Sequence, residues 1–363
     1  MKPTPLIAVF VSALLLAAAA SAAERPTGEK PGKLLIEFGW DEPDTAFMRA
    51  HLAEMEQTPF DGVVFHFKGD LAWQSWGTRR FEEKDIQSGV ADLKATPFKQ
   101  LTHNFVRLNT APAKIDWFDD HAAIVHNVTL VARAAREGGC KGVLFDTEQY
   151  EGQLFDYAKQ RDAKTKSWDQ YAAQARLRGR EVMQAFQEGY PDVTLFLTFG
   201  YSLPREESAN DPARLPTVHY GLLAPFLDGM VDAAKGKTCI VDGYELSYGY
   251  KDISRFASAY QAMKTGVLPF VHADHDRYHE VFSFGFGVWM DHNWRKNGWN
   301  ETDFSKNFYT PDTFEKTVTT AIKTSDQYVW IYTESPRWWS DQGKSVKLPQ
   351  AYDKALRSAK KSE

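Results

Sequence analysis

Residues 142–152, GVLFDTEQYEG, bring three carboxylates directly after an apolar run. Burying an unpaired carboxylate costs several kcal/mol. Asp146, Glu148 and Glu151 are therefore either structural acids held by hydrogen bonds and ion pairs, or they line a cleft where a buried strand ends. Two neighbouring carboxyl groups disfavour each other's ionised form, so one of them can keep its proton near neutral pH. Such a pair can act as general acid and general base.

Other acids follow apolar runs in the same way. Glu245, Asp291 and Glu334 each lie near the end of such a run, and WDE at 40–42 adds Asp41. If these runs are strands of one parallel barrel, their carboxyl ends share one rim, and the acids gather there. For any single acid, an ion pair or a helix cap is the alternative role.

The fold class follows from eight short apolar runs that recur along the chain. They cover residues 33–40, 62–67, 101–108, 142–148, 193–201, 239–248, 281–291 and 327–334. Most are apolar throughout rather than alternating, as strands covered on both faces are. Eight strand–helix units in one series predict an α/β protein with a single (β/α)8 TIM barrel over residues 24–363. A doubly wound open sheet is the runner-up, but it should carry a G-x-G-x-x-G turn, which the chain lacks.

Capping residues mark the helices that separate these strands. Asp44 is placed to cap the first of them, and Ser167 with Gln170 forms a capping box. Thr310 followed by Pro311 is typical of a helix start. The predicted helices cover residues 45–57, 168 to about 187, 253–264 after Asp252, a segment from 311, and 349–360.

Aromatic residues gather at the same strand ends, and the chain has 14% aromatic residues with 11 Trp. Sugar rings have flat C–H faces that pack on aromatic rings, and hydroxyls that carboxylates can bind. A rim of Trp, Tyr, Asp and Glu therefore suits a carbohydrate. The predicted binding residues are Trp40, Asp41, His66, Tyr150, Tyr201, Tyr248, Trp289, Asp291, Arg337 and Trp338. Trp330 and Tyr332 lie inside the last strand and are predicted to fill the barrel.

Two catalytic arrangements remain open. Cleavage of a glycosidic bond needs two carboxyl groups in different protonation states. Asp146 as nucleophile with Glu245 as acid/base would retain the configuration of the sugar, whereas Glu148 with the distant Glu334 would invert it. The first is favoured because the fourth and sixth strands are near neighbours and the fourth and eighth are opposed. The candidate catalytic residues are Asp146, Glu148, Glu245 and Glu334.

Local patterns resemble two groups of (β/α)8 glycoside hydrolases. The Asp-x-Glu of Asp146 and Glu148 resembles the chitinase-type hydrolases, which implies that the Glu is the acid and the Asp positions the N-acetyl group of the substrate. The chain is also similar to the α-galactosidase and endo-galactosaminidase barrels, which implies an Asp146 nucleophile and a Glu245 acid/base. Together these resemblances imply a glycoside hydrolase acting on a polysaccharide or oligosaccharide, with no required cofactor and no metal. A carbohydrate-binding barrel without catalysis and a polysaccharide lyase are the alternatives.

The amino terminus has the layout of a secretory signal peptide. Lys2 precedes an almost wholly apolar stretch over residues 6–20, and Ser21-Ala22-Ala23 supplies small residues for cleavage. We therefore expect residues 1–23 to be removed and the protein to be secreted or periplasmic, with no stable membrane insertion. The net charge of −5, without a basic stripe, makes nucleic acid an unexpected partner. The two cysteines, Cys140 and Cys239, are expected to be buried free thiols.

Overall fold

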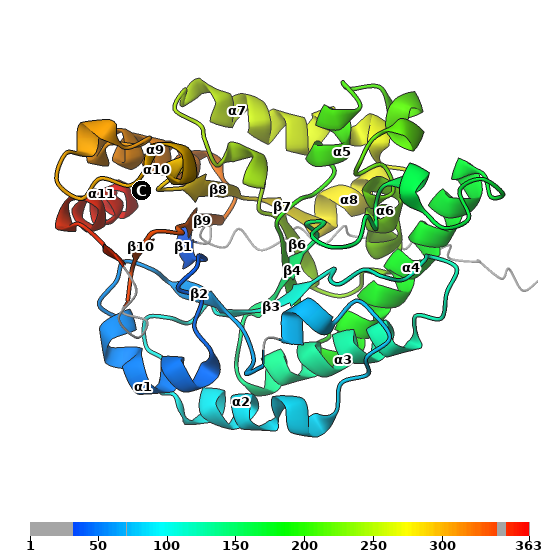
Figure 1. Cartoon of the computed structure of the whole chain (residues 1–363), viewed down its shortest axis with the longest axis horizontal. Helices are drawn as coiled ribbons and strands as arrows, with labels where there is room; N and C mark the ends of the chain where they lie inside the picture. Colours follow the sequence, from blue (N-terminus) through cyan, green and yellow to red (C-terminus); the bar gives the residue numbers. More distant parts are fainter. Residues whose placement is uncertain (1–31, 70, 340–345, 363) are drawn as a thin grey trace, which may run out of the picture. The chain divides into compact units, whose positions relative to one another are not determined.

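The described part of the chain is a barrel of parallel strands surrounded by helices (Figure 1). The structure is a computed structural model and describes residues 32–69, 71–339 and 346–362. Residues Lys33–Glu363 form one compact unit. The predicted signal peptide, residues 1–23, lies outside the described residues.

The strands are hydrogen-bonded in the order β7-β6-β5-β4-β3-β2-β1-β9-β8, and all of these pairs are parallel. β7 and β8 are separated only by Gly285, so together they form one interrupted strand. Because β7 pairs with β6 and β8 pairs with β9, this strand joins the two ends of the sheet and closes the barrel. The predicted (β/α)8 barrel is therefore confirmed. The strand bounds are β1 Leu34–Glu37, β2 Gly62–Phe65, β3 Phe105–Asn109, β4 Gly142–Asp146, β5 Thr194–Leu197, β6 Cys239–Asp242, β7 Phe282–Phe284, β8 Phe286–Trp289 and β9 Tyr328–Tyr332.

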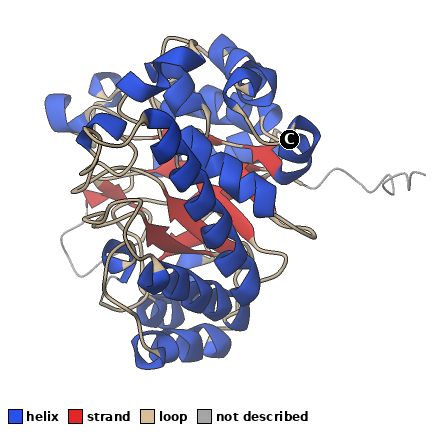
Figure 2. Ribbon diagram, turned by 90° about the vertical axis from the view of Figure 1, so that its right-hand side faces the viewer, coloured by secondary structure: helices blue, strands red, loops and turns tan. Residues whose placement is uncertain are grey.

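Helices cover the outside of the strands, as Figure 2 shows in a second view. A short parallel pair, β10 Pro336–Arg337 with β11 Val346–Lys347, follows the barrel. The helix bounds are α1 Thr45–Met55, α2 Glu83–Ala95, α3 Ala122–Glu137, α4 Trp168–Gly189, α5 Ser202–Glu207, α6 Leu223–Ala233, α7 Ser254–Gln261, α8 His275–Val281, α9 Trp294–Asn297, α10 Pro311–Thr324 and α11 Gln350–Lys361.

The capping predictions hold for most helices. The Asp44 carboxylate accepts a hydrogen bond from the Phe47 amide at the start of α1, and Ser167 and Gln170 form the capping box of α4. Thr310 caps α10. The prediction of one helix over residues 253–264 was wrong in detail, because α7 ends at residue 261 and the chain continues as a π-helical turn over residues 262–266.

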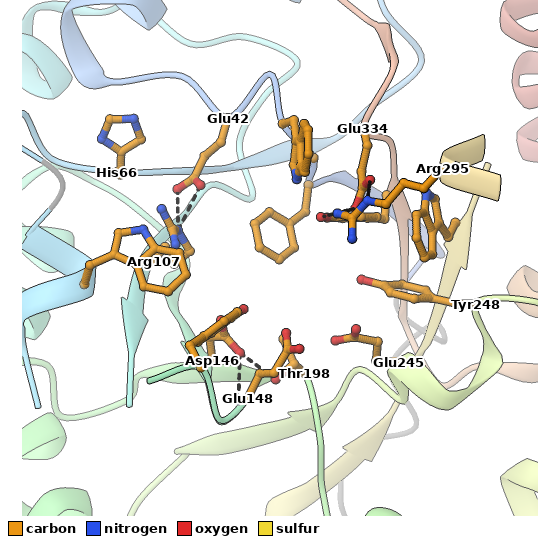
Figure 3. A pocket seen from close by; sticks show the side chains of 17 residues that line it. Glu42, His66, Arg107, Asp146, Glu148, Thr198, Glu245, Tyr248, Arg295 and Glu334 are labelled. Carbon is orange, nitrogen blue, oxygen red and sulfur yellow. Dashed lines mark hydrogen bonds and ion pairs between the residues drawn. The ribbon is translucent and has the colours of Figure 1, made fainter. Parts of the chain in front are cut away.

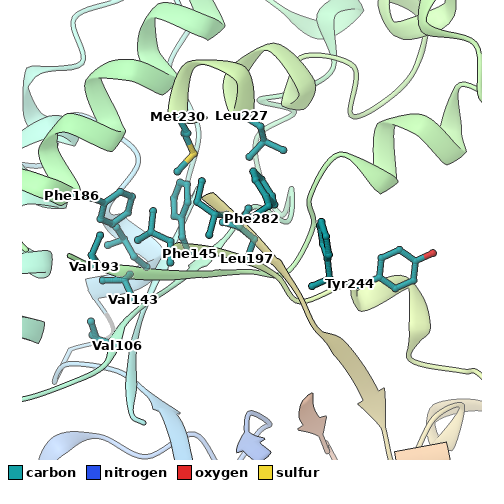
Figure 4. Packing of buried hydrophobic residues seen from close by; sticks show 14 of the residues in the cluster. Val106, Val143, Phe145, Phe186, Val193, Leu197, Leu227, Met230, Tyr244 and Phe282 are labelled. Carbon is teal, nitrogen blue, oxygen red and sulfur yellow. The ribbon is translucent and has the colours of Figure 1, made fainter. Parts of the chain in front are cut away.

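Alternating side chains along the strands build two hydrophobic cores. The inner core fills the barrel with Ile36, Val64, Phe105, Leu144, Phe196, Val241, Tyr328 and Trp330. The outer core lies between strands and helices, and Figure 4 shows part of it, where residues of β3, β4 and β5 meet residues of α4 and α6. The inner core makes the barrel a solid support, so a binding site has to lie at one of its ends.

Close strand packing explains two glycines at strand starts. A Cβ at Gly142 would lie 1.8 Å from the Thr194 carbonyl oxygen, and one at Gly62 would lie 1.9 Å from the His103 carbonyl oxygen. Only glycine fits where backbones approach this closely. Gly142 therefore holds β4 in register against β5, and with it the acids that follow β4.

Two further expectations can be compared with the described residues. Cys140 and Cys239 are free, the first buried and the second partly buried. In the part of the chain that the structure describes, no helix is both long enough and apolar enough to cross a membrane.

Candidate active site

A cavity of about 690 Å³ lies at the carboxyl ends of the barrel strands (Figure 3). Every strand of the barrel contributes to its lining, either directly or through the loop that follows it. The lining residues are Phe38, Gly39, Trp40, Glu42, His66, Trp73, Arg107, Asp146, Glu148, Tyr150, Thr198, Glu245, Tyr248, Trp289, Arg295, Tyr332 and Glu334. Aromatic rings and carboxylates thus share one cavity.

Asp146 ends β4 and is held by three hydrogen-bond donors. Its Oδ1 accepts from the Glu148 amide at 2.9 Å and from the Thr198 hydroxyl at 3.0 Å, and its Oδ2 accepts from the Tyr150 hydroxyl at 2.7 Å. Burial raises the pKa of Asp146, while these hydrogen bonds and Arg107 lower it. The net effect is a raised pKa. The donors stabilise the ionised form and already use most of the acceptor capacity of Asp146.

Glu148 lies two residues further on, with its side chain partly exposed to the cavity. Burial and the negative charge of Asp146 raise the pKa of Glu148 to about 7, while Tyr150 and Arg295 act in the opposite direction. A carboxyl group with this pKa changes protonation state near neutral pH, as acid–base catalysis requires.

Glu245 reaches the same cavity through a sharp turn after β6. Tyr244 takes a left-handed conformation, φ 45° and ψ 63°, and its amide donates to Asp242 Oδ1 at 3.0 Å. Non-glycine residues rarely adopt this conformation, and such strain is concentrated at functional sites. Burial, then the charge of Glu148, then that of Asp146, raise the pKa of Glu245 well above its usual value. Glu245 is therefore the carboxyl group that holds its proton.

Glu334 follows β9 and is a carboxylate fixed by cations and donors. Arg295 Nε and Nη2 donate to Glu334 Oε2 and Oε1 at 2.7 and 2.5 Å, and Trp294 Nε1 donates to Oε2 at 2.6 Å. The Glu334 side chain is only 3% exposed. A bidentate pair with arginine, which is always charged, suits a fixed acceptor better than a group that gives and takes protons.

A second carboxylate–guanidinium pair lies at the opposite side of the cavity. Arg107 Nε lies 2.9 Å from Glu42, and both side chains are almost fully buried. The Arg107 guanidinium also lies over the Trp73 ring, 5.2 Å from its centre. Figure 3 shows Glu42 and Arg107 on one side, Glu334 and Arg295 on the other, and Asp146, Glu148 and Glu245 along the floor.

The structure brings nine of the fourteen predicted site residues into this cavity. All four candidate catalytic residues line it, and five of the candidate binding residues do so. The nine residues are Asp146, Glu148, Glu245, Glu334, Trp40, His66, Tyr150, Tyr248 and Trp289.

The other five predicted binding residues do not line the cavity, for reasons visible in their contacts. Asp41 is buried and accepts from the Trp338 amide at 2.7 Å. Tyr201 is buried and donates to Asp228 on α6 at 2.9 Å. Asp291 accepts from the Glu334 and Ser335 amides, so it supports the loop after β9. Trp338 packs against Phe60 outside the barrel, and the guanidinium of Arg337 lies 6.0 Å from the centre of the Trp40 ring.

Several lining residues were not among the predicted site residues. Arg107 could have been found from the sequence, because it is a charged residue within an apolar run. It lies two residues after Phe105 on β3, so it faces into the barrel as Phe105 does. Arg295 lies on the short helix α9 and Trp73 on a 3-10 turn over residues 71–74, each too short for its periodicity to indicate which way a side chain points. Tyr332 was predicted to fill the barrel, and it both packs on the inner core and lines the cavity.

No group of three or more His, Cys, Asp or Glu in the described part of the chain is arranged to hold a metal ion. His275 and His279, four residues apart in the sequence, lie on α8, which leads into the amino-terminal end of β7. The cavity lies at the carboxyl ends of the strands.

Three solved structures with a similar fold are very distant from this chain in sequence. A family 5 xyloglucanase from Paenibacillus pabuli aligns with a TM-score of 0.51 at 10% identity, covering 91% of this chain and 99% of that one. An endocellulase from Pyrococcus horikoshii gives a TM-score of 0.47 at 11% identity, covering 93% and 94%. A broad-specificity endoglucanase from Bacteroides salanitronis gives 0.48 at 12%, covering 91% and 92%.

The chain has the (β/α)8 fold of the family 5 xyloglucanase. At this identity the likeness concerns the fold alone, since one barrel fold hosts many unrelated reactions. No protein-family model and no curated protein matches the chain.

Proposed function

We propose that this protein is a glycoside hydrolase that cleaves bonds between sugars in an oligosaccharide or polysaccharide. The observation that carries the proposal is the pair Glu148 and Glu245, two carboxyl groups with raised pKa that reach one cavity lined by aromatic rings, where the charge of Glu148 helps to raise the pKa of Glu245. Glycosidic cleavage needs one protonated and one ionised carboxyl group near the same bond. The structural likeness to a xyloglucanase supports the proposal at the level of the fold.

The roles follow from which group holds its proton. Glu245 is the acid, because burial and two neighbouring negative charges favour its neutral form. Glu148 is the nucleophile, because it is the member of the pair that ionises near neutral pH and its side chain reaches the cavity. Asp146 is a positioning residue, because three donors occupy its oxygens and it thereby orients the loop of Glu148. It also adds negative charge close to Glu148 and Glu245.

The proposed reaction has two steps. Glu148 attacks the anomeric carbon while Glu245 gives its proton to the departing glycosidic oxygen, so the C–O bond breaks and a glycosyl ester forms on Glu148. Glu245, now ionised, then takes a proton from water as that water attacks the anomeric carbon, which breaks the bond to Glu148 and frees its carboxylate. The sugar is released with retained configuration and Glu245 regains its proton.

Azide distinguishes these roles on an activated aryl glycoside. Glu245→Ala is expected to lose activity, with azide restoring turnover and giving a glycosyl azide of retained configuration. Glu148→Ala with azide is expected to give the inverted azide, because azide then replaces the nucleophile. Glu151→Ala is the matched control, since Glu151 is exposed and paired with Lys114 outside the cavity. An inverted product from Glu245→Ala would exchange the two roles, and sugar binding without turnover by the unmodified protein would favour a binding barrel.

We also propose that the protein works outside the cytoplasm after removal of residues 1–23. The support is the charge, the apolar stretch and the small residues of that segment. Expression with the native amino terminus should give an exported protein whose mass shows cleavage after Ala23. Retention of the full-length chain in the cytoplasm would contradict this.

A further inference from the structure

Two opposite walls of the cavity are built from the same three kinds of group. The Arg107 wall consists of Glu42, Trp73, Arg107 and Tyr150, and the Arg295 wall consists of Trp40, Trp289, Arg295 and Glu334. In each wall a carboxylate pairs with a guanidinium, and that guanidinium lies over a tryptophan ring: 5.2 Å from Trp73 for Arg107, and 5.2 Å from Trp40 for Arg295.

The order of the strands places the proposed catalytic pair between the two walls. Arg107 lies on β3, and Arg295 follows β8, which is opposite β3 in the barrel. β4, β5 and β6 lie between them on one side, and Glu148 and Glu245 come from the ends of β4 and β6. Figure 3 shows the same arrangement, with both glutamates on the floor between Arg107 and Arg295.

The exposed rings offer stacking surfaces at both walls. Trp40 is 49% exposed and Tyr150 is 41% exposed, which is unusual for such large apolar groups in this chain. Tyr150 meets Trp73 edge to face, with ring centres 4.5 Å apart, and Trp40 meets Trp294 in the same way at 6.2 Å. These contacts fix the rings in place, so a ligand that stacks on them loses less conformational freedom on the protein side.

The ion pairs determine what kind of sugar these walls fit. A guanidinium donates hydrogen bonds and its partner carboxylate accepts them. Each pair can therefore donate hydrogen bonds to sugar hydroxyl groups and accept hydrogen bonds from them. Each pair has no net charge, and the floor between them carries the anion of Asp146. A sugar carboxylate would meet arginines that are already paired and an adjacent negative charge, which disfavours binding.

We propose that an uncharged oligosaccharide spans the cavity from one wall to the other, so that sugars are held on both sides of the bond that is cleaved. This inference rests on the proposed function for the position of that bond, but its test uses binding and does not depend on turnover. It makes Trp73 and Trp40 specificity-determining residues for two different parts of one ligand.

Binding is measured in a Glu245→Gln background, which keeps the shape of the floor. The probes are uncharged gluco-, xylo-, manno- and galacto-oligosaccharides of one to six units, in α- and β-linked series, with oligogalacturonides as the anionic comparison. For at least one uncharged series, affinity should rise with length until both walls are contacted and then level off. The anionic series should bind at least tenfold more weakly at low salt.

Two wall variants and a surface variant complete the design. Trp73→Ala and Trp40→Ala should each lower the affinity for the longest ligand about tenfold, the loss of one aromatic contact. For a ligand that reaches only the opposite wall, each variant should change the affinity by less than about twofold relative to the Glu245→Gln background. Leu177→Ala, an exposed residue of α4, should change neither affinity.

Any of the following results would overturn the inference. These are affinity that does not change beyond one unit, loss of binding from one wall variant while the other has no effect, and tightest binding of the oligogalacturonides. The absence of binding by every uncharged series would have the same consequence. If binding follows the expected pattern but the unmodified protein releases no sugar, the proposed hydrolase function fails and the two-wall inference stands.

Discussion

The charge of Asp146 controls the pH range of the proposed reaction, and replacing it by asparagine tests this directly. In Asp146→Asn the new side chain would keep the shape of the old one and the acceptor that faces the Glu148 amide and the Thr198 hydroxyl. Its amide group can donate to the Tyr150 hydroxyl, which accepts as well as donates. The variant therefore removes a negative charge and keeps the hydrogen-bonded turn after β4.

The direction of the effect follows from the causes of the raised pKa values. The pKa of Glu148 is raised from 4.5 to about 7, with burial as the largest cause and the charge of Asp146 second. The Asp146 contribution to the raised pKa of Glu148 is therefore smaller than that of burial. The charge of Asp146 also raises the pKa of Glu245, as the third cause after burial and Glu148.

Removing a neighbouring negative charge favours the ionised form, so both pKa values should fall in Asp146→Asn. In the proposed mechanism the acidic limb of the kcat/KM profile reports ionisation of Glu148, and the basic limb reports loss of the Glu245 proton. Both limbs should therefore move towards acid. Limbs that do not move, or a move towards alkaline pH, would refute the proposed role of Asp146. Thermal unfolding of the variant checks that the fold is kept.

Three further predictions concern other parts of the chain. Glu334→Gln should raise KM several-fold with kcat changed less than about tenfold, because its carboxylate is fixed by Arg295; a kcat loss of several orders of magnitude would make it a catalytic residue. Glu37, buried beside Asp41, has a raised pKa, so its contribution to stability is lost as pH rises through that pKa. In chemical denaturation, the free energy of unfolding of Glu37→Gln should rise relative to that of the unmodified protein above pH 4.5, by up to about 1.4 kcal/mol per pH unit. A difference that does not change with pH would contradict this. Gly142→Ala should lower the free energy of unfolding by at least about 3 kcal/mol, because the added Cβ would clash with the Thr194 carbonyl oxygen. An unchanged melting temperature would contradict this close approach of the two strands.

The barrel could be predicted because strands buried on both faces keep a simple pattern. Seven of the eight predicted runs overlap one continuous strand each, while residues 281–291 contain both β7 and β8. The interruption at Gly285 was not predicted, although a glycine within a strand indicates a bend or a close approach. A Cβ there would lie 2.7 Å from the Tyr328 carbonyl oxygen of β9. The position of the break therefore depends on a neighbour that is distant in the sequence.

The side chains within strands were placed more accurately than those in the loops. Asp146 ends a strand, and its direction follows from the alternation of β4. Beyond the strand end the alternation no longer holds: Trp40 lines the cavity, whereas its neighbour Asp41 is buried against the segment of Trp338. Tyr201 directly precedes α5, which directs its ring to α6 instead of the cavity.

The pairing of acids with arginines was the largest gap between sequence and site. Glu42 and Arg107 are 65 residues apart, and Arg295 and Glu334 are 39 residues apart, so no local pattern connects them. From the sequence alone, Asp146 with Glu245 was favoured over Glu148 with Glu334, on the spacing of the strands. Arginines occupy the oxygens of Glu42 and Glu334, and three donors occupy those of Asp146. Asp146, Glu148 and Glu245 all have a raised pKa, but Asp146 is enclosed by its donors, whereas Glu148 and Glu245 reach the substrate space and therefore carry the proposed reaction.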